Sequence, residues 1–208
     1  MITRALIILN VLAFGCESMD MNRALNLGAL TPDSVLVGHQ WYRIVTAAFL
    51  HGGLVHIGVN MISLWALGRF IEMAAGSART LLIYIVAMIA SGLGVVYLSS
   101  PAYLDVPTLG ASGAIFGLFG ALFAIGFKLG PPGMQLIRDN LGILILNLII
   151  TFAPGLNISW QAHVCGLLAG FVLTLLIYTP PRRVAPVVTD AATGQAYETE
   201  YQTPEPPR

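Results

Sequence analysis

The chain has 208 residues, of which 56% are hydrophobic and only 10% are charged, and its mean hydropathy is +0.79. Soluble globular domains carry about 25% charged residues, so this composition excludes an ordinary soluble protein and indicates several membrane spans. The formal net charge is zero and the basic residues stand singly. Nucleic-acid binding needs a basic patch, so no nucleic acid is expected as a partner.

The first candidate span, residues 5–16, is the weakest. Its dozen mostly apolar residues are interrupted by Asn10, and it approaches a spanning length only if Arg4 extends its charged end toward the interface. The same segment resembles a signal peptide, with Gly15-Cys16 where a lipoprotein signal is cleaved. Phe14 is bulky where such processing prefers a small residue, so we expect a retained span.

The next segment, residues 17–53, is too long for a hairpin and contains many apolar and aromatic residues. We expect it to lie partly in the membrane interface, because Trp41 and Tyr42 suit the headgroup level. Arg43 is expected to bond either loop carbonyls or lipid phosphate. An interfacial anchor needs no chemistry, so this loop alone gives no functional signal.

Five later segments each approach the roughly 20 apolar residues that cross a hydrocarbon layer of about 30 Å. They are residues 54–73, 80–98, 109–127, 136–152 and 160–178. The expected fold class is therefore an all-α membrane protein, a six-transmembrane-helix bundle with a long first outer loop. We expect residues 1–178 to form this core. Residues 179–208, rich in proline and small polar residues, are expected to be a disordered cytoplasmic tail.

Basic residues fall unevenly on the two sides of six such spans. One side receives Arg4, Arg69, Arg79, Lys128, Arg138, Arg182, Arg183 and Arg208. The other side receives Arg23 and Arg43. By the positive-inside rule both termini are expected in the cytoplasm or its topological equivalent. The rule does not distinguish a bacterial inner membrane from the membrane of an organelle; of the two, a bacterial inner (plasma) membrane is the expected location.

Polar groups gather near the outer ends of three spans. His51, His56 and Asn60 lie at the start of the second span, Ser112 near the start of the fourth, and His163 near the start of the sixth. At 1.5 Å per residue, all five lie within about two helical turns of the outer face. A lone serine or histidine in a membrane helix usually serves packing. Several polar groups at one depth instead indicate a functional site.

Small residues follow both Ser112 and His163 at helical spacing. They are Gly113, Gly117, Gly120 and Ala124 in the fourth span, and Gly166 and Gly170 in the sixth. Such stripes let two membrane helices approach closely. Close approach is what lets a short serine side chain come within the 2.6 to 3.2 Å of an imidazole that general-base activation requires.

A serine nucleophile also needs hydrogen-bond donors that stabilise the oxyanion, and each is worth about 2.7 to 4 kcal/mol. The candidates are His56, Asn60 and the backbone N–H of Ser112. No acidic residue is expected at the depth of His163, so the sequence predicts a Ser112–His163 dyad rather than a triad. For His51 we expect a structural role, either capping the span or bonding nearby backbone.

In their order and span placement, these motifs resemble the rhomboid family of intramembrane serine proteases over residues 4–178. The matching pieces are Trp41-Tyr42-Arg43, His51-Gly52-Gly53-Leu54-Val55-His56 with Asn60, Gly110-Ala111-Ser112-Gly113-Ala114-Ile115-Phe116-Gly117, and Ala162-His163 with Gly166 and Gly170.

The resemblance implies an endopeptidase that cleaves single-span membrane proteins in or beside their transmembrane segments. It implies that Ser112 is the nucleophile and His163 the general base. It also implies that His56 and Asn60 stabilise the oxyanion and that His51 is structural. The implied partners are such substrates and the lipid bilayer, and no metal or cofactor is implied.

Two positions depart from the family pattern. Family members often place tryptophan directly before the loop arginine, where this chain has Tyr42, with Trp41 one residue earlier. Some members place tyrosine four residues after the nucleophile, where Phe116 keeps a stacking surface without the hydroxyl.

Two other functions stay open on the sequence. A catalytically silent rhomboid-like protein that binds membrane helices is expected to lack the nucleophile or the base, whereas this chain has Ser112 and His163. A transporter that uses buried histidines as a proton path has no need of a serine between glycines. Cys16 and Cys165 lie in different apolar segments and match no metal spacing, so neither a disulfide framework nor a metal site is expected. The fifth span, interrupted by Asn147, is a candidate lateral gate for substrate.

Overall fold

The long apolar runs of the sequence form helices. The computed structural model describes residues 1–152, 158–180, 187–189 and 196–198. The helices of the first half are α1 (Ile2–Glu17), α2 (Met21–Gly28), α3 (Pro32–Leu36), α4 (Arg43–Thr46), the 3₁₀ turn η1 (Ala47–Phe49), α5 (Leu54–Ala75) and α6 (Ser77–Leu98). They are followed by the 3₁₀ turn η2 (Pro101–Tyr103), α7 (Ser112–Leu129), α8 (Pro131–Thr151) and α9 (Trp160–Ile177). The tail adds two short strands, β1 (Val187–Thr189) and β2 (Ala196–Glu198).

Five of the helices, α5 to α9, are long and apolar enough to cross a membrane. The 16 residues of α1 rise about 24 Å, and this helix qualifies as a span only together with α2, from which it is bent by 119°. Large apolar side chains such as Ile62 and Leu176 are more than 70% exposed, as expected for faces that contact lipid tails. The chain is therefore a multi-pass, all-helical membrane protein with five to six candidate spans, which confirms the predicted fold class.

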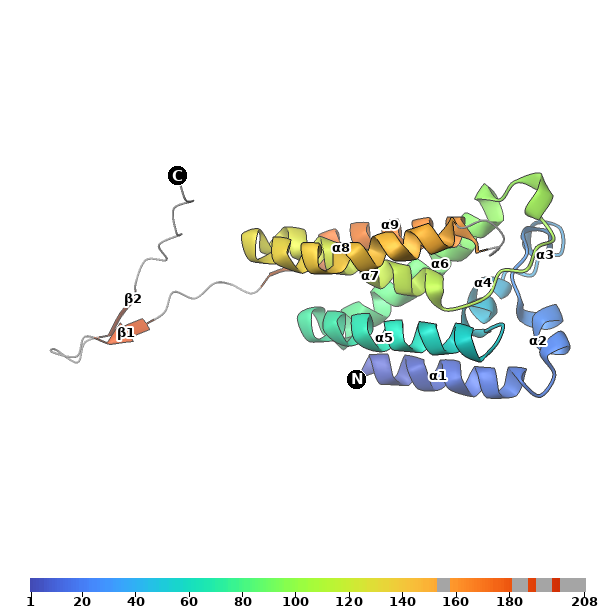
Figure 1. The fold of residues 1–208 in the computed structure, drawn as a ribbon, viewed down its shortest axis with the longest axis horizontal. Coiled ribbons are helices and arrows are strands. Elements are labelled where there is room, and N and C mark those ends of the chain that lie inside the picture. The colour runs from blue at the N-terminus through green and yellow to red at the C-terminus, as the bar shows by residue number, and fades with distance from the viewer. Residues whose placement is uncertain (153–157, 181–186, 190–195, 199–208) are drawn as a thin grey trace. The chain divides into compact units, whose positions relative to one another are not determined.

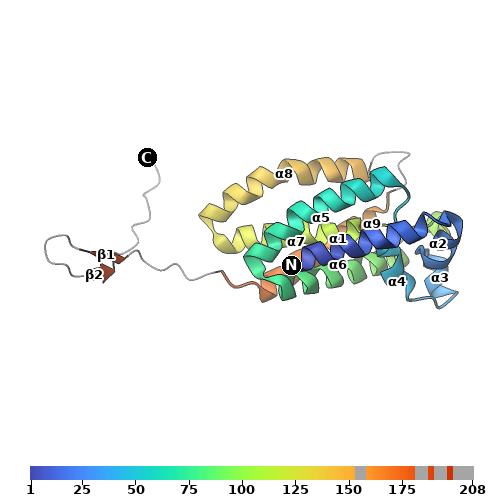
Figure 2. The ribbon, with the colours of Figure 1, turned by 90° about the horizontal axis from the view of Figure 1, so that it is seen from below.

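Helix α7 is the centre of the bundle. It packs against α5, α6, α8 and α9, and 78% of its 18 residues are buried. Figure 1 shows α7 running between α8 and α5, and Figure 2 shows α8 along one side of the bundle. In the apolar stretch of α8 only 17% of the residues are buried. The residues at the start of α7 are therefore held by several neighbours, whereas α8 is held by few.

Four helix starts differ from the sequence prediction. Helix α1 begins at Ile2 rather than residue 5 and α6 at Ser77 rather than residue 80; the other two differences have a clear backbone cause. The fourth span was predicted from residue 109 but α7 begins at Ser112, because Gly110 has a φ of +116° that helical geometry does not allow. The fifth span was predicted from residue 136 but α8 begins at Pro131. Gly130, with a φ of +69°, ends α7, and proline is well suited to the first position of the next helix.

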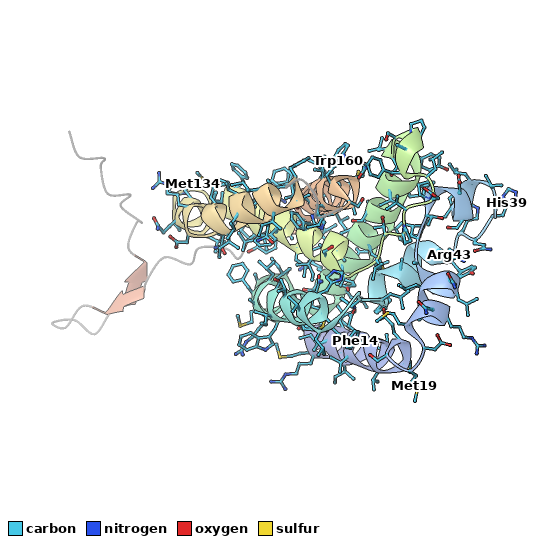
Figure 3. All side chains as sticks on the ribbon, turned by 45° about the vertical axis from the view of Figure 1, so that its right-hand side comes forward. Phe14, Met19, His39, Arg43, Met134 and Trp160 are labelled. Atoms are coloured by element: carbon cyan, nitrogen blue, oxygen red, sulfur yellow. The ribbon has the colours of Figure 1, made fainter. Side chains whose placement is uncertain are left out.

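The long first loop is folded into α2, α3, α4 and η1, and Arg43 ties these pieces together. Its guanidinium donates to the carbonyls of Asn26 and Ala29, both at 2.7 Å, and to the side-chain oxygen of Gln40. Figure 3 shows Arg43 among the short helices of this loop, away from Met134 in the first turn of α8. Of the two partners expected for Arg43, the structure therefore has the loop carbonyls.

Buried carboxylates fix both ends of α1. At its start, Glu72 of α5 accepts hydrogen bonds from the backbone N–H groups of Ile2 and Thr3 and from the Thr3 hydroxyl. These N–H groups belong to the first turn, which has no carbonyl partners of its own, and a negative charge there also suits the helix dipole. At the other end, Glu17 accepts from the backbone N–H of His51 at 2.8 Å.

Residues 179–208 form a unit separate from residues 1–178. Within it, β1 and β2 pair antiparallel, with Val187 opposite Glu198. The sequence predicted no strand in this tail. Apart from these strands and residues 179–180, the predicted disordered tail lies outside the described residues, so its disorder stays a prediction.

Candidate active site

Ser112 is the first residue of α7, and its position depends on the turn before it. Gly110 takes a positive φ, and a Cβ atom there would also lie 2.8 Å from Nε2 of His56. Glycine is thus required both by the backbone conformation and by the space that the His56 ring occupies. The turn places the Ser112 hydroxyl at the helix start, where Oγ lies 2.9 Å from Nε2 of His163 on α9.

Glycines on α7 and α9 allow this approach. A methyl group added at Gly170 would overlap backbone atoms of Gly117, and one at Gly166 would overlap the carbonyl oxygen of Gly113. A methyl group at Gly120 would likewise overlap the carbonyl oxygen of Leu167. The two helices are therefore in backbone contact at three successive levels over about two turns, an approach that larger side chains would prevent.

His163 is 7% exposed and is held on three sides. Its ring stacks on Phe116, with centroids 4.0 Å apart and planes at 11°. Nε2 faces Ser112, and Nδ1 lies 2.7 Å from Oγ1 of Thr151, the last residue of α8. Ser159 caps the start of α9 by accepting from the backbone N–H of Ala162. The imidazole thus has a fixed plane and a polar partner on each nitrogen.

His56 and Asn60 lie one turn apart on α5. Nδ1 of His56 accepts from the backbone N–H of Gly52 at 3.3 Å, so in the neutral ring the proton is on Nε2, the atom that faces Gly110. The Asn60 side-chain amide donates to the carbonyl of His56 at 2.9 Å and keeps a second N–H. His56 therefore presents a donor on the side of the loop before Ser112, and Asn60 lines the same cavity as His56 and Ser112.

The backbone N–H of Ser112 is a third donor. It belongs to the first turn of α7, where N–H groups have no intrahelical carbonyl partner. The dipole of this helix also favours negative charge at its start.

His51 lies outside the spans, between η1 and α5, and is fully buried. Its Nδ1 lies 3.2 Å from the carbonyl oxygen of Phe49, and its ring meets the His56 ring edge-on at a centroid distance of 5.1 Å. Burial, and to a smaller extent the nearby His56, lowers the pKa of His51 from 6.5 to about 4. His51 therefore contacts His56, and its ring is not directed at Ser112 or His163.

A cavity of about 940 Å³ opens over these groups and is lined mainly by apolar side chains of α5, α6, α7, α8 and α9. The predicted site residues that line it are His56, Asn60, Ser112, Gly113, Phe116 and His163. The remaining ones, His51, Gly117, Gly166 and Gly170, lie behind it. A mostly apolar cavity with a few convergent polar groups is typical of a binding or active site.

One residue of this site, Thr151, was not predicted from the sequence, and the role of a second, Gly110, was not predicted either. Thr151 contacts His163 across helices, and its only signal was a hydroxyl at the end of the fifth span, four residues after Asn147. Gly110 was noted as part of a motif, but the reason for it, the space taken by His56, depends on how α5 packs beside the turn.

Comparisons with known proteins agree with this architecture. The profile of the rhomboid domain matches residues 38–180. The chain is 34% identical over 149 residues to the rhomboid protease GluP of Bacillus subtilis, covering 71% of this chain and 28% of that protein. It is 34% identical over 161 residues to the RHOMBOID-like protein 5 of Arabidopsis thaliana, covering 75% and 50%. It is 32% identical over 136 residues to the rhomboid protease GlpG of Yersinia pestis, covering 64% and 47%. The matched region thus spans half or less of the length of these relatives.

Proposed function

Because the chain belongs to the rhomboid family, we propose that it is an intramembrane serine endopeptidase, with Ser112 as the nucleophile and His163 as the general base. Its relatives in Bacillus subtilis and Yersinia pestis are named rhomboid proteases. The observation that supports this proposal most strongly is the distance of 2.9 Å between Oγ of Ser112 and Nε2 of His163, two residues 51 positions apart.

In the first half of the reaction, Oγ of Ser112 attacks the carbonyl carbon of the substrate peptide bond while its proton passes to Nε2 of His163. The tetrahedral intermediate collapses as the C–N bond breaks, and His163 gives the proton to the leaving amine. In the second half, water attacks the acyl-enzyme carbonyl and loses a proton to His163. The proton then returns to Ser112 as the acid product leaves.

The negative oxygen of each intermediate needs donors that are already in place. His56, Asn60 and the backbone N–H of Ser112 are proposed for this role, because the three residues line one cavity. The positive end of α7 adds to their effect. Together these groups supply the stabilisation that lets a dyad act without an acidic third member.

The proposed substrates are single-span membrane proteins. A transmembrane helix protects its carbonyls with internal hydrogen bonds, so the segment to be cut must unwind before Ser112 can reach it. Unwound backbone cannot remain in lipid but is tolerated in a cavity that admits water. The cavity over Ser112 and His163 fits this need.

We further propose that the site lies near the outer face of a bacterial inner membrane, with both termini in the cytoplasm. This rests on the uneven distribution of basic residues and on the bacterial relatives. In this arrangement residues 1–178 form the catalytic core, with residues 179–208 as a cytoplasmic tail.

The test is reconstitution of the purified protein in liposomes with a single-span substrate, compared with Ser112→Ala and His163→Ala. We expect cleavage by the wild type and none above background by either variant. Equal cleavage by Ser112→Ala would refute the assignment. Absence of cleavage by all three, together with capture of the substrate, would favour a silent helix-binding protein.

A fluorophosphonate probe gives a second readout that needs no substrate. It is expected to label Ser112 in the wild type and to leave Ser112→Ala unlabelled, as judged by mass spectrometry of the modified peptide. Labelling at another serine would contradict the proposed nucleophile.

A further inference from the structure

Both ring nitrogens of His163 have a polar partner, and the second partner comes from a different helix than the first. Nε2 lies 2.9 Å from the Ser112 hydroxyl on α7, and Nδ1 lies 2.7 Å from the Thr151 hydroxyl on α8. We propose that Thr151 is a positioning residue: it fixes which ring nitrogen of His163 is free to take the proton of Ser112. This inference rests on the proposed function.

The assignment follows from counting protons. The Thr151 hydroxyl has one hydrogen, and it donates this hydrogen to the carbonyl oxygen of Asn147 one turn earlier, at 2.7 Å. A carbonyl oxygen can only accept, so the lone pairs of Oγ1 are what the hydroxyl offers to His163. Nδ1 must then be the protonated nitrogen, and Nε2 carries the lone pair that faces Ser112.

The opposite tautomer would disable the base. If Nε2 carried the hydrogen, it would donate to Oγ of Ser112 and could not accept the Ser112 proton. By accepting from Nδ1–H, Thr151 favours the productive tautomer and continues to accept while the ring is positively charged. In triads a carboxylate on the second nitrogen performs this task, and here a neutral hydroxyl stands in that position.

Burial makes this contact important. Thr151 is 4% exposed and His163 is 7% exposed, so bulk water has little access to replace a lost acceptor. The stacked Phe116 sets the ring plane but offers Nδ1 no lone pair in that plane. The hydrogen bond from Nδ1 to Thr151 is therefore the interaction that defines the tautomer.

The experiment measures kcat and KM for a single-span substrate in liposomes, for the wild type, Thr151→Val and Thr151→Ser. Valine keeps the shape of threonine and removes the hydroxyl, whereas serine keeps the hydroxyl. A hydrogen bond to a charged group corresponds to about 10- to 100-fold in rate. We expect Thr151→Val to lower kcat by about that factor with KM unchanged, and Thr151→Ser to stay within about threefold of the wild type.

Thr80 provides a matched control. It is also a buried threonine of a membrane helix, and its hydroxyl donates to the carbonyl of Gly76 one turn earlier, but it lies near the start of α6 rather than in the site. Thr80→Val removes the same kind of hydrogen bond and is expected to leave kcat unchanged. A loss of kcat in Thr151→Val that Thr80→Val does not share is thus assigned to His163.

Two results would overturn the inference. One is a Thr151→Val protein with kcat within twofold of the wild type. The other is an equal loss in Thr151→Val and Thr151→Ser, because the hydroxyl would then not be the cause. Ser112→Ala in the same assay distinguishes a failure of this inference from a failure of the proposed function. If Ser112→Ala is inactive while Thr151→Val is fully active, the proposed function stands and only the role of Thr151 is refuted.

Discussion

Replacing Gly170 by alanine is the most direct test of how the site is built. The added methyl group would overlap the carbonyl oxygen, carbonyl carbon and Cα of Gly117. These are backbone atoms of a helix and cannot rotate away, so α7 and α9 must move apart, by an amount on the order of 1 Å. The hydrogen bond between Ser112 and His163 is 2.9 Å long, which leaves only about 0.3 Å before the limit of useful proton transfer at about 3.2 Å.

A misplacement of about 1 Å can cost about 100-fold in rate. We therefore expect Gly170→Ala to lower kcat/KM for a single-span substrate in liposomes by roughly that factor. Overpacking of this kind also costs about 1 to 3 kcal/mol of stability, which a lower unfolding temperature in detergent micelles would report. For the unfolding temperature to fall, this overpacking cost has to exceed the gain of about 1 kcal/mol that alanine brings to a helix relative to glycine.

Gly142 is the matched control, because it is also a glycine of a membrane helix but has nothing within 4 Å of the added methyl group. Gly142→Ala is expected to keep full activity and an unchanged or higher unfolding temperature. If Gly170→Ala cleaves within about threefold of the wild type, backbone contact between α7 and α9 is not what positions Ser112 against His163.

Three further predictions concern single side chains. Phe116→Leu removes the ring stacked on His163. Because aromatic stacking contributes about 0.5 to 1.5 kcal/mol, kcat/KM is expected to fall about 2- to 10-fold. An unchanged kcat/KM would argue against an orienting role of Phe116. Glu72→Gln weakens the anchor at the start of α1, where charged hydrogen bonds are worth about 1.5 to 3 kcal/mol. The unfolding temperature should drop while kcat of the folded protein stays constant, and an unchanged unfolding temperature would contradict the anchor. Because burial lowers the pKa of His51 from 6.5 to about 4, the unfolded chain binds a proton first as the pH falls, so stability should decrease between pH 6.5 and 4. His51→Asn should show a smaller decrease across that window, and an equal one would exclude His51 as its source.

The fold class follows from the sequence because its signal is local. Each apolar run long enough to cross a bilayer becomes a helix whatever its neighbours are, since unpaired backbone groups in lipid are too costly. The short first span was the uncertain element, and it remains the helix that qualifies only together with α2. The Glu72 carboxylate holds the start of α1 in the bundle. It bonds residues about 70 positions away in the chain, so no local pattern in the sequence could indicate this contact.

The sequence by itself also singled out Ser112, His163 and the glycines beside them as candidates, because a polar group in an apolar run and a repeat of three or four residues are both visible in one dimension. Only the tertiary structure decided which atoms meet. The Thr151 hydroxyl and Nδ1 of His163 lie on different helices, and a hydrogen bond between them depends on tenths of an ångström in how α8 and α9 cross. Hydrophobicity adds up along the chain, whereas hydrogen-bond geometry depends on the positions of all the helices at once.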